Sequence, residues 1–322
     1  MDSARQFRLV LRVLTNLFYT FVDKIIQENT MDKKTHTRQR LAAAFVVLFL
    51  SLPAMAQNFH EDSLKVGGEM RHFVTYLPSG LKPDAPTVFV LHGYGGGIWR
   101  ENPMIATAQR EGFAVCIPQG LRDPKGKPSW NVGYPFQEGW KVDDVKALCS
   151  IARYVQKRHG LSKKNTFLTG MSNGGEMCYL MAYSNQKTFK AVAPIAGLTM
   201  LWMYNELNAK KPMPVLEIHG TEDRTSEWFG DIENKGGWGA YIAVPLAVGF
   251  WATKNRCRKM ETERMESLNP KNGRHIIKHR FTESPWGADV WLYEVVGGKH
   301  TWHTEDINTA DEIWTFFSKF LE

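Results

Sequence analysis

A lone serine flanked by glycines stands where a β-branched and aromatic stretch gives way to helix-favouring residues, in NTFLTGMSNGGEM at 165–177. Gly170, Ser172 and Gly174 fit the pattern G-x-S-x-G, which in a strand–turn–helix setting holds a nucleophilic serine on a sharp corner. Glycine is needed at both flanking positions because a β-carbon there would collide with the neighbouring strand and helix. The same pattern also fits an ordinary tight turn that caps a helix, so its meaning depends on the rest of the chain.

A serine hydroxyl becomes a useful nucleophile when a base takes its proton and a carboxylate orients that base. After Ser172, the best-placed acid is Asp223 in EIHGTEDRT, and the best-placed histidine is His300 in VVGGKHTWH. Both follow apolar stretches, and their order of serine, acid and histidine predicts a catalytic triad. The sequence leaves open Glu222 or Asp231 as the acid and His303 as the base; His300 is preferred because it lies nearer the end of the preceding strand.

The glycine-rich segment LHGYGGG at 91–97 would let the backbone approach a ligand closely. Acyl transfer needs donors for a developing oxyanion, and the backbone amides of Tyr94 and Asn173 are the expected pair. Phosphate binding is not indicated, because the segment has neither the Walker lysine nor a G-x-G-x-x-G followed by a helix. His92 and His219, which precede glycines, are interpreted as structural hydrogen-bonding residues.

Buried-type apolar stretches alternate with helical patterns along the chain. Because these stretches are continuously apolar and helices separate them, they indicate a mostly parallel sheet covered on both faces, an α/β three-layer sandwich. Ligands of such sheets bind beyond the carboxyl ends of the strands, where all four candidate loops begin. The strands are expected at 70–78, 87–93, 113–118, 165–170, 190–197, 213–220 and 289–298, and the helices at 142–160, 173–184, 243–255 and 307–321.

Five segments together resemble the secreted esterase family of polyhydroxybutyrate depolymerases and feruloyl or acetylxylan esterases: LHGYGGG, WNVGYPFQEGWKVDDVKAL, TGMSNGGEMCYLMA, IHGTED and GGKHTWH. The resemblance covers residues 65–320. It implies the α/β-hydrolase fold and serine carboxylester hydrolysis without cofactor or metal, with Ser172, Asp223 and His300 at the triad positions. Residues 143–145 match a family segment interpreted as the structural start of a helix. Tyr94 stands where many members have cysteine, and the segment after Asp223 is longer than usual.

The expected substrate is acylated plant polysaccharide such as xylan, from which the enzyme would remove feruloyl or acetyl groups. A polyhydroxybutyrate-type polyester is the alternative, and a non-catalytic carbohydrate-binding protein on a hydrolase scaffold is a third interpretation. Exposed aromatic faces suit sugar rings or phenolic acyl groups. Six tryptophans are expected in loops around the site, namely Trp130, Trp140, Trp202, Trp228, Trp238 and Trp302; of these, Trp140, Trp228 and Trp302 are the candidates for substrate binding. Trp251, Trp291 and Trp314 are expected in the core.

The N-terminal region predicts export. Residues 31–56 combine a basic start, an apolar run from Leu41 to Leu52 and the small-residue pattern Ala54-Met55-Ala56, which is typical of a signal peptide cleaved before Gln57. The apolar run is too short for a membrane span, so a secreted or periplasmic protein with no stable span after cleavage is expected. Residues 1–30 are interpreted as an over-extended reading frame, with an amphipathic anchor at 5–26 as the alternative. Residues 57–322 are expected to form a single domain.

The charge distribution and the cysteines bear on whether the protein binds nucleic acid, holds a metal ion or forms disulfides. Residues 1–56 hold eight Lys/Arg and four Asp/Glu, so +4 of the net charge of +7 falls there. The remainder has no basic cluster dense enough to follow a nucleic acid. Export would permit disulfides among Cys116, Cys149, Cys178 and Cys257, and the sequence leaves their pairing open. The strand and helix positions of the first three favour buried free thiols, and no cysteine spacing indicates a metal site.

Overall fold

The computed structural model describes residues 58–322, which form one compact unit. The predicted over-extended start, the signal peptide at 31–56 and its cleavage site before Gln57 lie outside the described residues. Those three points therefore stay predictions.

A ten-stranded sheet organises the described chain, in the order β1-β2-β4-β3-β7-β8-β9-β12-β11-β10. The strands from β4 to β12 in this order run parallel to one another, and an antiparallel pair extends each edge. The strands are β1 (Phe59–Val66), β2 (Glu69–Tyr76), β3 (Thr87–Leu91), β4 (Ala114–Pro118), β7 (Thr166–Met171), β8 (Ala191–Ile195), β9 (Val215–Gly220), β10 (Lys259–Glu266), β11 (His275–Thr282) and β12 (Val290–Val296); β5 (Leu121–Arg122) and β6 (Pro128–Ser129) pair separately.

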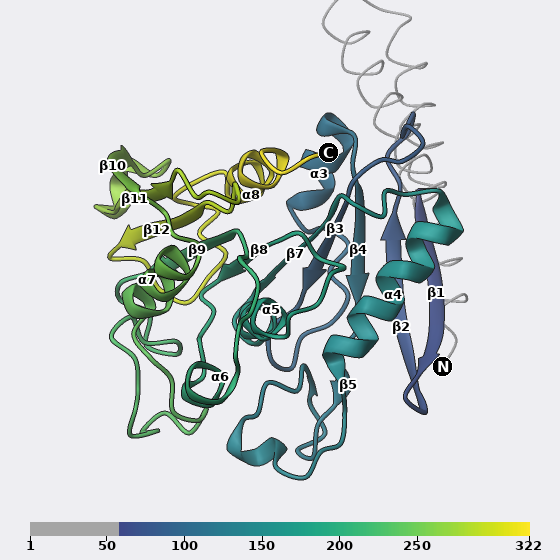
Figure 1. Cartoon of the computed structure of the whole chain (residues 1–322), viewed down its shortest axis with the longest axis horizontal. Coiled ribbons are helices and arrows are strands. Elements are labelled where there is room, and N and C mark those ends of the chain that lie inside the picture. The colour runs from purple at the N-terminus through teal and green to yellow at the C-terminus, as the bar shows by residue number, and fades with distance from the viewer. Residues whose placement is uncertain (1–57) are drawn as a thin grey trace, which may run out of the picture. The chain divides into compact units, whose positions relative to one another are not determined.

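Helices cover both faces of the sheet, as the sequence predicts. Side chains alternate along β3, so Phe89 and Leu91 enter one core while Val88 and Val90 enter the other. The first core includes α4 (Asp144–His159), α5 (Asn173–Tyr183) and α7 (Val244–Lys254), which lie in front of the sheet in Figure 1. The second core includes α3 (Met104–Glu111) and α8 (Thr309–Ser318). The predicted three-layer α/β sandwich is therefore confirmed.

The antiparallel edges are the part of the sheet that the sequence did not indicate fully. Strand β2 matches the expected 70–78 segment, but β1, β10 and β11 were not predicted. In β10 seven of eight residues are exposed, and in β1 no residue is fully buried. Edge strands of this kind lack the continuous apolar run of a central strand, so hydrophobicity alone does not reveal them.

The helix that opens at residues 143–145 is anchored as a structural element. Asp143 caps α4 by accepting a hydrogen bond from the Lys146 amide at 2.8 Å. Asp144 forms a buried ion pair with Arg71 of β2 at 2.6 Å and also accepts the Asn131 amide at 2.7 Å. These contacts tie α4 to the sheet edge and to the loop before the helix, which confirms the structural interpretation of this segment.

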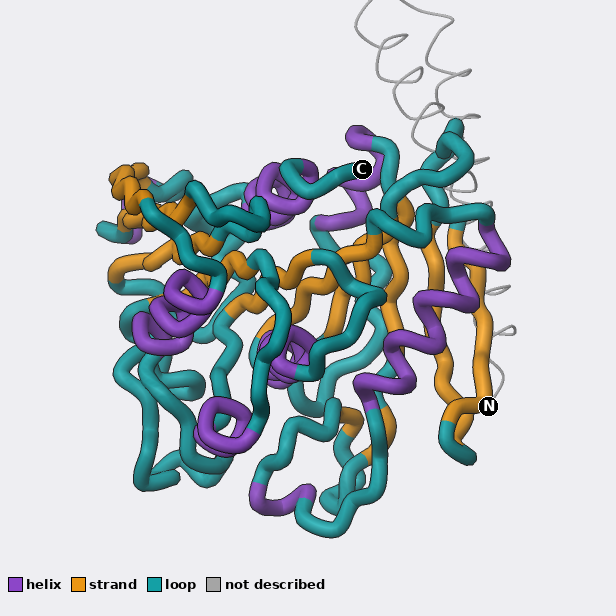
Figure 2. The backbone as a smooth tube through the Cα atoms, viewed as in Figure 1, coloured by secondary structure: helices purple, strands orange, loops and turns teal. Residues whose placement is uncertain are grey.

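The loops after β3, β7, β9 and β12 leave the sheet from one edge, because these strands are parallel. Figure 2 shows long loops gathered at the lower side of the view, where β5 and the short helix α6 (Leu201–Glu206) also lie. The four cysteines are free thiols, and Cys116, Cys149 and Cys178 are buried, as expected from their elements.

Candidate active site

Ser172 occupies a strained corner between β7 and α5. Its φ of 56° and ψ of −124° lie outside the regions that residues with a side chain favour. A β-carbon at Gly170 would lie 2.7 Å from the Gly174 carbonyl group, and one at Gly174 would lie 2.6 Å from the Leu91 carbonyl oxygen. The expected collisions at both glycines are therefore confirmed, and the chain can make this corner only with glycine there.

Asp223 and His300 meet at the same edge. His300 Nδ1 lies 2.7 Å from Asp223 Oδ2, while Asp223 Oδ1 accepts hydrogen bonds from the amides of Thr225 and Ser226, each at 2.8 Å. Burial by itself would raise the pKa of Asp223, but the contact with His300 and the two amides lower it overall. The Asp223 carboxylate is thus held ionised and oriented toward the half-buried His300.

A second buried pair lies behind Asp223. His219 Nδ1 is 2.8 Å from Glu217 Oε1, and His219 Nε2 is 2.8 Å from the Ser226 carbonyl oxygen and 3.8 Å from Asp223 Oδ2. Because that carbonyl can only accept, Nε2 carries a proton and His219 fixes the turn whose amides hold Asp223. His219 is therefore a structural hydrogen-bonding residue, as predicted, and so is His92, whose Nε2 accepts the Gly120 amide at 2.9 Å.

The residues that the sequence left open as alternative base and acid do not form a comparable histidine–carboxylate contact. His303 is fully buried with a positive φ of 55°, and its closest charged partner is Asp306 at 3.7 Å. Burial lowers the pKa of His303 to about 4. Asp231 accepts the Gly236 amide at 2.7 Å inside its own loop, and Glu222 is exposed beside His300. Among these histidines and acids, the structure brings His300 and Asp223 into hydrogen-bonding contact.

The glycine loop after β3 packs against the serine corner. A β-carbon at Gly93 would lie 3.4 Å from the Ser172 Cβ, so the Gly93–Tyr94 backbone passes directly beside Ser172. Asn173 begins α5 and is fully buried; its side chain accepts the Trp130 amide at 2.7 Å and donates to the Trp130 carbonyl at 3.1 Å. Within residues 58–322 the amides of Tyr94 and Asn173 donate no hydrogen bond, so both are available to a ligand.

Two hollows flank the catalytic candidates and share Thr225. A narrow pocket with a volume of about 10 Å³ is lined by Ser172, Glu176, Tyr134, Leu198, Trp238, Thr225 and Ser226. An open groove with a volume of about 370 Å³ is lined by His300, Glu222, Arg224, Lys299 and Thr225. We refer to them as the Ser172 pocket and the His300 groove.

Glu176 and Tyr134 are the parts of the site that the sequence did not indicate. Glu176 is 2% exposed on α5, and the Tyr134 hydroxyl donates a hydrogen bond to its Oε2. Burial raises the pKa of Glu176 to about 7. Tyr94, Tyr134 and Trp238 contact one another with ring centroids 5.4 to 6.3 Å apart. The one sequence feature that could have indicated Glu176 is that it is the only charged residue in the mostly apolar stretch GGEMCYLMA.

The tryptophans selected as substrate-binding candidates differ from expectation. Trp228 is 7% exposed and belongs to the core, where it packs edge-on to His219, so its assignment to the site is corrected. Trp140 and Trp302 are half-buried, and neither lines the Ser172 pocket; Trp302 packs edge-on to Trp99. Trp238, on the long loop after Asp223, lines the Ser172 pocket instead, and its ring packs against Tyr94, Tyr134 and Phe136. The predicted core tryptophans Trp251, Trp291 and Trp314 are buried.

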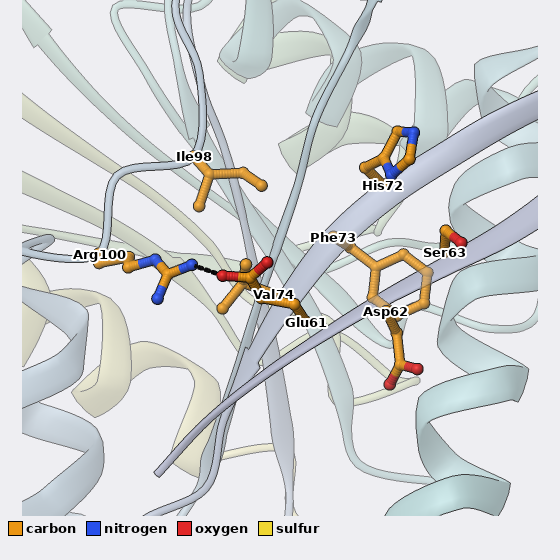
Figure 3. Close-up of a pocket in the computed structure, with 8 residues that line it drawn as sticks. All are labelled: Glu61, Asp62, Ser63, His72, Phe73, Val74, Ile98 and Arg100. Atoms are coloured by element: carbon orange, nitrogen blue, oxygen red, sulfur yellow. Dashed lines mark hydrogen bonds and ion pairs between the residues drawn. The ribbon is translucent and has the colours of Figure 1, made fainter. Parts of the chain in front are cut away.

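A separate hollow lies at the β1–β2 edge of the sheet (Figure 3). It is lined in part by Glu61, Asp62 and His72 of the two strands and by Ile98 and Arg100 of the loop after β3. Figure 3 shows the ion pair between Arg100 and Glu61 across its mouth. None of the predicted catalytic residues lines this hollow.

No three histidine, cysteine, aspartate or glutamate side chains in residues 58–322 gather as ligands of a metal ion would. Over the same range, every helix is too short or too polar to cross a membrane.

Comparisons with known proteins agree with this architecture. A family model described as "Prolyl oligopeptidase family" matches residues 104–223. Among solved structures, the acetyl xylan esterase from Aspergillus awamori superposes with a TM-score of 0.58 at 14% identity, covering 81% of this chain and 99% of that one. The chain is an α/β hydrolase by fold.

Proteins with similar sequences indicate which group of α/β hydrolases the chain resembles. The chain is 28% identical over 264 residues to the bifunctional acetylxylan esterase/xylanase of Neocallimastix patriciarum, in a match covering 80% of this chain and 35% of that protein. The chain thus spans about a third of that relative's length. It is 22% identical over 316 residues to feruloyl esterase D of Neurospora crassa, covering 87% and 98% of the two chains. A poly(3-hydroxyalkanoate) depolymerase also matches. These relatives support a carbohydrate-esterase-like group of α/β hydrolases, at low identity.

Proposed function

We propose that the protein is a serine esterase that removes short acyl groups from acylated polysaccharide, such as the acetyl groups of xylan. Ser172 is the nucleophile, His300 the proton carrier and Asp223 the carboxylate that orients His300. The amides of Tyr94 and Asn173 bind the oxyanion. The observation that carries this proposal is the 2.7 Å contact between His300 and Asp223, beside a serine on a strained glycine-flanked corner.

The reaction proceeds through an acyl-enzyme. Ser172 Oγ forms a bond to the ester carbonyl carbon while its proton passes to His300 Nε2. When the carbon–oxygen bond to the alcohol breaks, His300 returns that proton to the leaving oxygen. Water then attacks the acyl-Ser172 ester, again giving a proton to His300, and the proton returns to Ser172 Oγ as the carboxylic acid departs. The ionised Asp223 stabilises the His300 imidazolium that forms in both halves of the reaction.

The two hollows support an assignment of the two halves of the substrate. His300 must reach the leaving oxygen, so the alcohol lies on the side of the His300 groove and the acyl group lies in the Ser172 pocket. The open groove suits a bulky alcohol such as a sugar chain, and its Arg224 and Lys299 suit acidic substituents on that chain. The narrow pocket has a volume of about 10 Å³, which is room for about one water-sized group, so an acetyl or similarly short group suits it better than a feruloyl group. The acetylxylan esterases among the relatives support this choice.

A polyester depolymerase is the second candidate. Phe229 and Ile232 are 84% and 69% exposed on the loop after Asp223. Two such apolar side chains near a catalytic edge favour contact with an apolar polymer surface. The match to a poly(3-hydroxyalkanoate) depolymerase supports the same reading.

The test combines labelling with a substrate panel. A fluorophosphonate probe should label the wild type and not Ser172→Ala, which should retain the fold but lacks the nucleophile. Initial rates on acetylated xylan, methyl ferulate and short 3-hydroxybutyrate oligomers then compare the acyl groups, and acetylated xylan should be the fastest. Equal labelling of both proteins would refute the serine mechanism, and fastest turnover of the oligomers would favour the second candidate.

We also propose that the protein acts outside the cytoplasm, because residues 31–56 have the features of a signal peptide. N-terminal sequencing of the exported protein should begin at Gln57. A mature chain that retains residues 1–30 would refute both the cleavage site and the proposed start at Met31.

A further inference from the structure

Glu176 is a buried carboxyl group that lines the Ser172 pocket without a cation beside it. It follows Ser172 by one helical turn, and its amide donates to the Ser172 carbonyl at 2.9 Å. The Tyr134 hydroxyl contacts Oε2, and Asn173 also lies close enough to favour the ionised form. No Lys, Arg or His among residues 58–322 forms an ion pair with this carboxyl, so neighbouring charge does not explain its burial.

Such a group costs stability at neutral pH. Burial penalises its ionised form, and α5 around it is mostly apolar, so a methionine or leucine at this position would avoid that cost. Titratable groups with strongly perturbed pKa values concentrate at functional sites, and this one borders the proposed nucleophile. The position therefore fits a role in substrate recognition better than a role in folding.

The chemistry of the pocket selects among ligands for Glu176. An apolar acyl tail would offer the carboxyl no hydrogen bond beyond those from Tyr134 and Asn173, and an ammonium group would have to give up its own hydration in a narrow pocket. A hydroxyl group pairs with the carboxyl in either protonation state, because it donates to a carboxylate and accepts from a carboxylic acid. Trp238 and Leu198 supply apolar contact for the carbons that carry that hydroxyl.

We propose that Glu176, held by Tyr134, is a specificity-determining residue that selects short acyl groups carrying a hydroxyl over apolar acyl groups of the same size. This proposal rests on the proposed function, because it takes the Ser172 pocket as the acyl side of a serine esterase. In this proposal Glu176 discriminates between acyl groups, whereas the polysaccharide contacts the His300 groove on the other side of Ser172.

The experiment uses two methyl esters that differ by a hydroxyl in place of a methyl group, methyl 3-hydroxypropionate and methyl butyrate. The ratio of their kcat/KM values is measured for the wild type, Glu176→Met and Glu176→Gln by titrating the acid released. Comparing the ratio between proteins cancels the intrinsic reactivity of the two esters. Glu176→Met should reduce the preference for the hydroxyl ester about tenfold or more, since a hydrogen bond to a charged group contributes about 1.5–3 kcal/mol. Glu176→Gln should reduce it less, because the amide still forms hydrogen bonds.

A matched control comes from a second tyrosine–glutamate pair. The Tyr293 hydroxyl donates to Glu312 Oε2 at 2.8 Å on α8, outside the Ser172 pocket. Tyr293→Phe removes the same kind of hydrogen bond and should leave the substrate ratio unchanged. Thermal unfolding and fluorophosphonate labelling verify that each variant is folded and carries a reactive serine.

The outcomes separate the two proposals. An unchanged ratio in Glu176→Met, with both esters hydrolysed, overturns the role of Glu176 and leaves the esterase intact. Faster hydrolysis of methyl 3-aminopropionate than of the hydroxyl ester by the wild type also overturns it, in favour of a cationic acyl group. A wild type that reacts with the probe but hydrolyses neither ester refutes the acyl assignment of the Ser172 pocket. A wild type that does neither refutes the proposed function itself.

Discussion

The replacement of Glu176 by glutamine should make the protein more stable at alkaline pH. Burial raises the pKa of Glu176 from 4.5 to about 7, and the groups that act on it are Tyr134 and Asn173, with Tyr241 near enough to feel its charge. Below pH 4.5 both the folded and unfolded states are protonated. Between pH 4.5 and 7 the unfolded state releases the proton that the folded state keeps, so stability falls as pH rises. Above pH 7 the loss is complete and constant.

The size of the effect follows from the pKa change. One pKa unit is worth about 1.4 kcal/mol, so the ionised carboxyl destabilises the folded state by about 3 kcal/mol at pH 8.5. At pH 5 most of that loss is absent. Glutamine has nearly the same shape, still accepts the Tyr134 hydrogen bond and does not titrate. The gain in unfolding free energy from Glu176→Gln should therefore be about 2–3 kcal/mol larger at pH 8.5 than at pH 5.

Urea unfolding followed by tryptophan fluorescence measures this difference at both pH values. Glu312→Gln is the control, because Glu312 accepts from Tyr293 but also faces the Lys278 ammonium at 2.7 Å. Losing that ion pair should lower stability, which is the opposite sign. If Glu176→Gln changes the unfolding free energy by the same amount at pH 5 and pH 8.5, the carboxyl is not buried as described and the reasoning fails.

Three further predictions concern the corner, the base and the sheet edge. Gly174→Ala should prevent folding or lower the unfolding free energy by several kcal/mol, as circular dichroism and urea titration would show, because its β-carbon would lie 2.6 Å from a carbonyl oxygen. His300→Ala should lower kcat by roughly 10⁴-fold or more, whereas His303→Ala should lower the melting temperature and keep measurable turnover; the reverse pattern would reassign the base. Asp144→Asn should cost about 3–5 kcal/mol by leaving Arg71 buried and unpaired, and a loss below 1 kcal/mol in urea titration would contradict that ion pair's role.

Much of the fold was accessible from the sequence because local patterns encode it. Continuously apolar strands separated by helices indicated the layers and the parallel centre of the sheet. Gly170 and Gly174 indicated a sharp corner at which a β-carbon on either residue would collide with neighbouring backbone. The order of Ser172, Asp223 and His300 indicated the candidate triad, since each follows a strand and parallel strands end at one edge. The antiparallel edges were missed because exposed strands carry no apolar run.

Only the tertiary structure decided which side chains share the pocket. The sequence offered six loop tryptophans, and the fold buried Trp228 in the core while placing Trp238 in the wall of the Ser172 pocket. It also turned Glu176 inward, where burial gives an ordinary glutamate a pKa of about 7. Such properties arise from contacts between segments far apart in the chain, so residue type and spacing cannot report them. The sequence by itself indicated the nucleophile candidate Ser172 and its triad partners; the packing of distant loops around Ser172 decided the size and polarity of the pocket beside it.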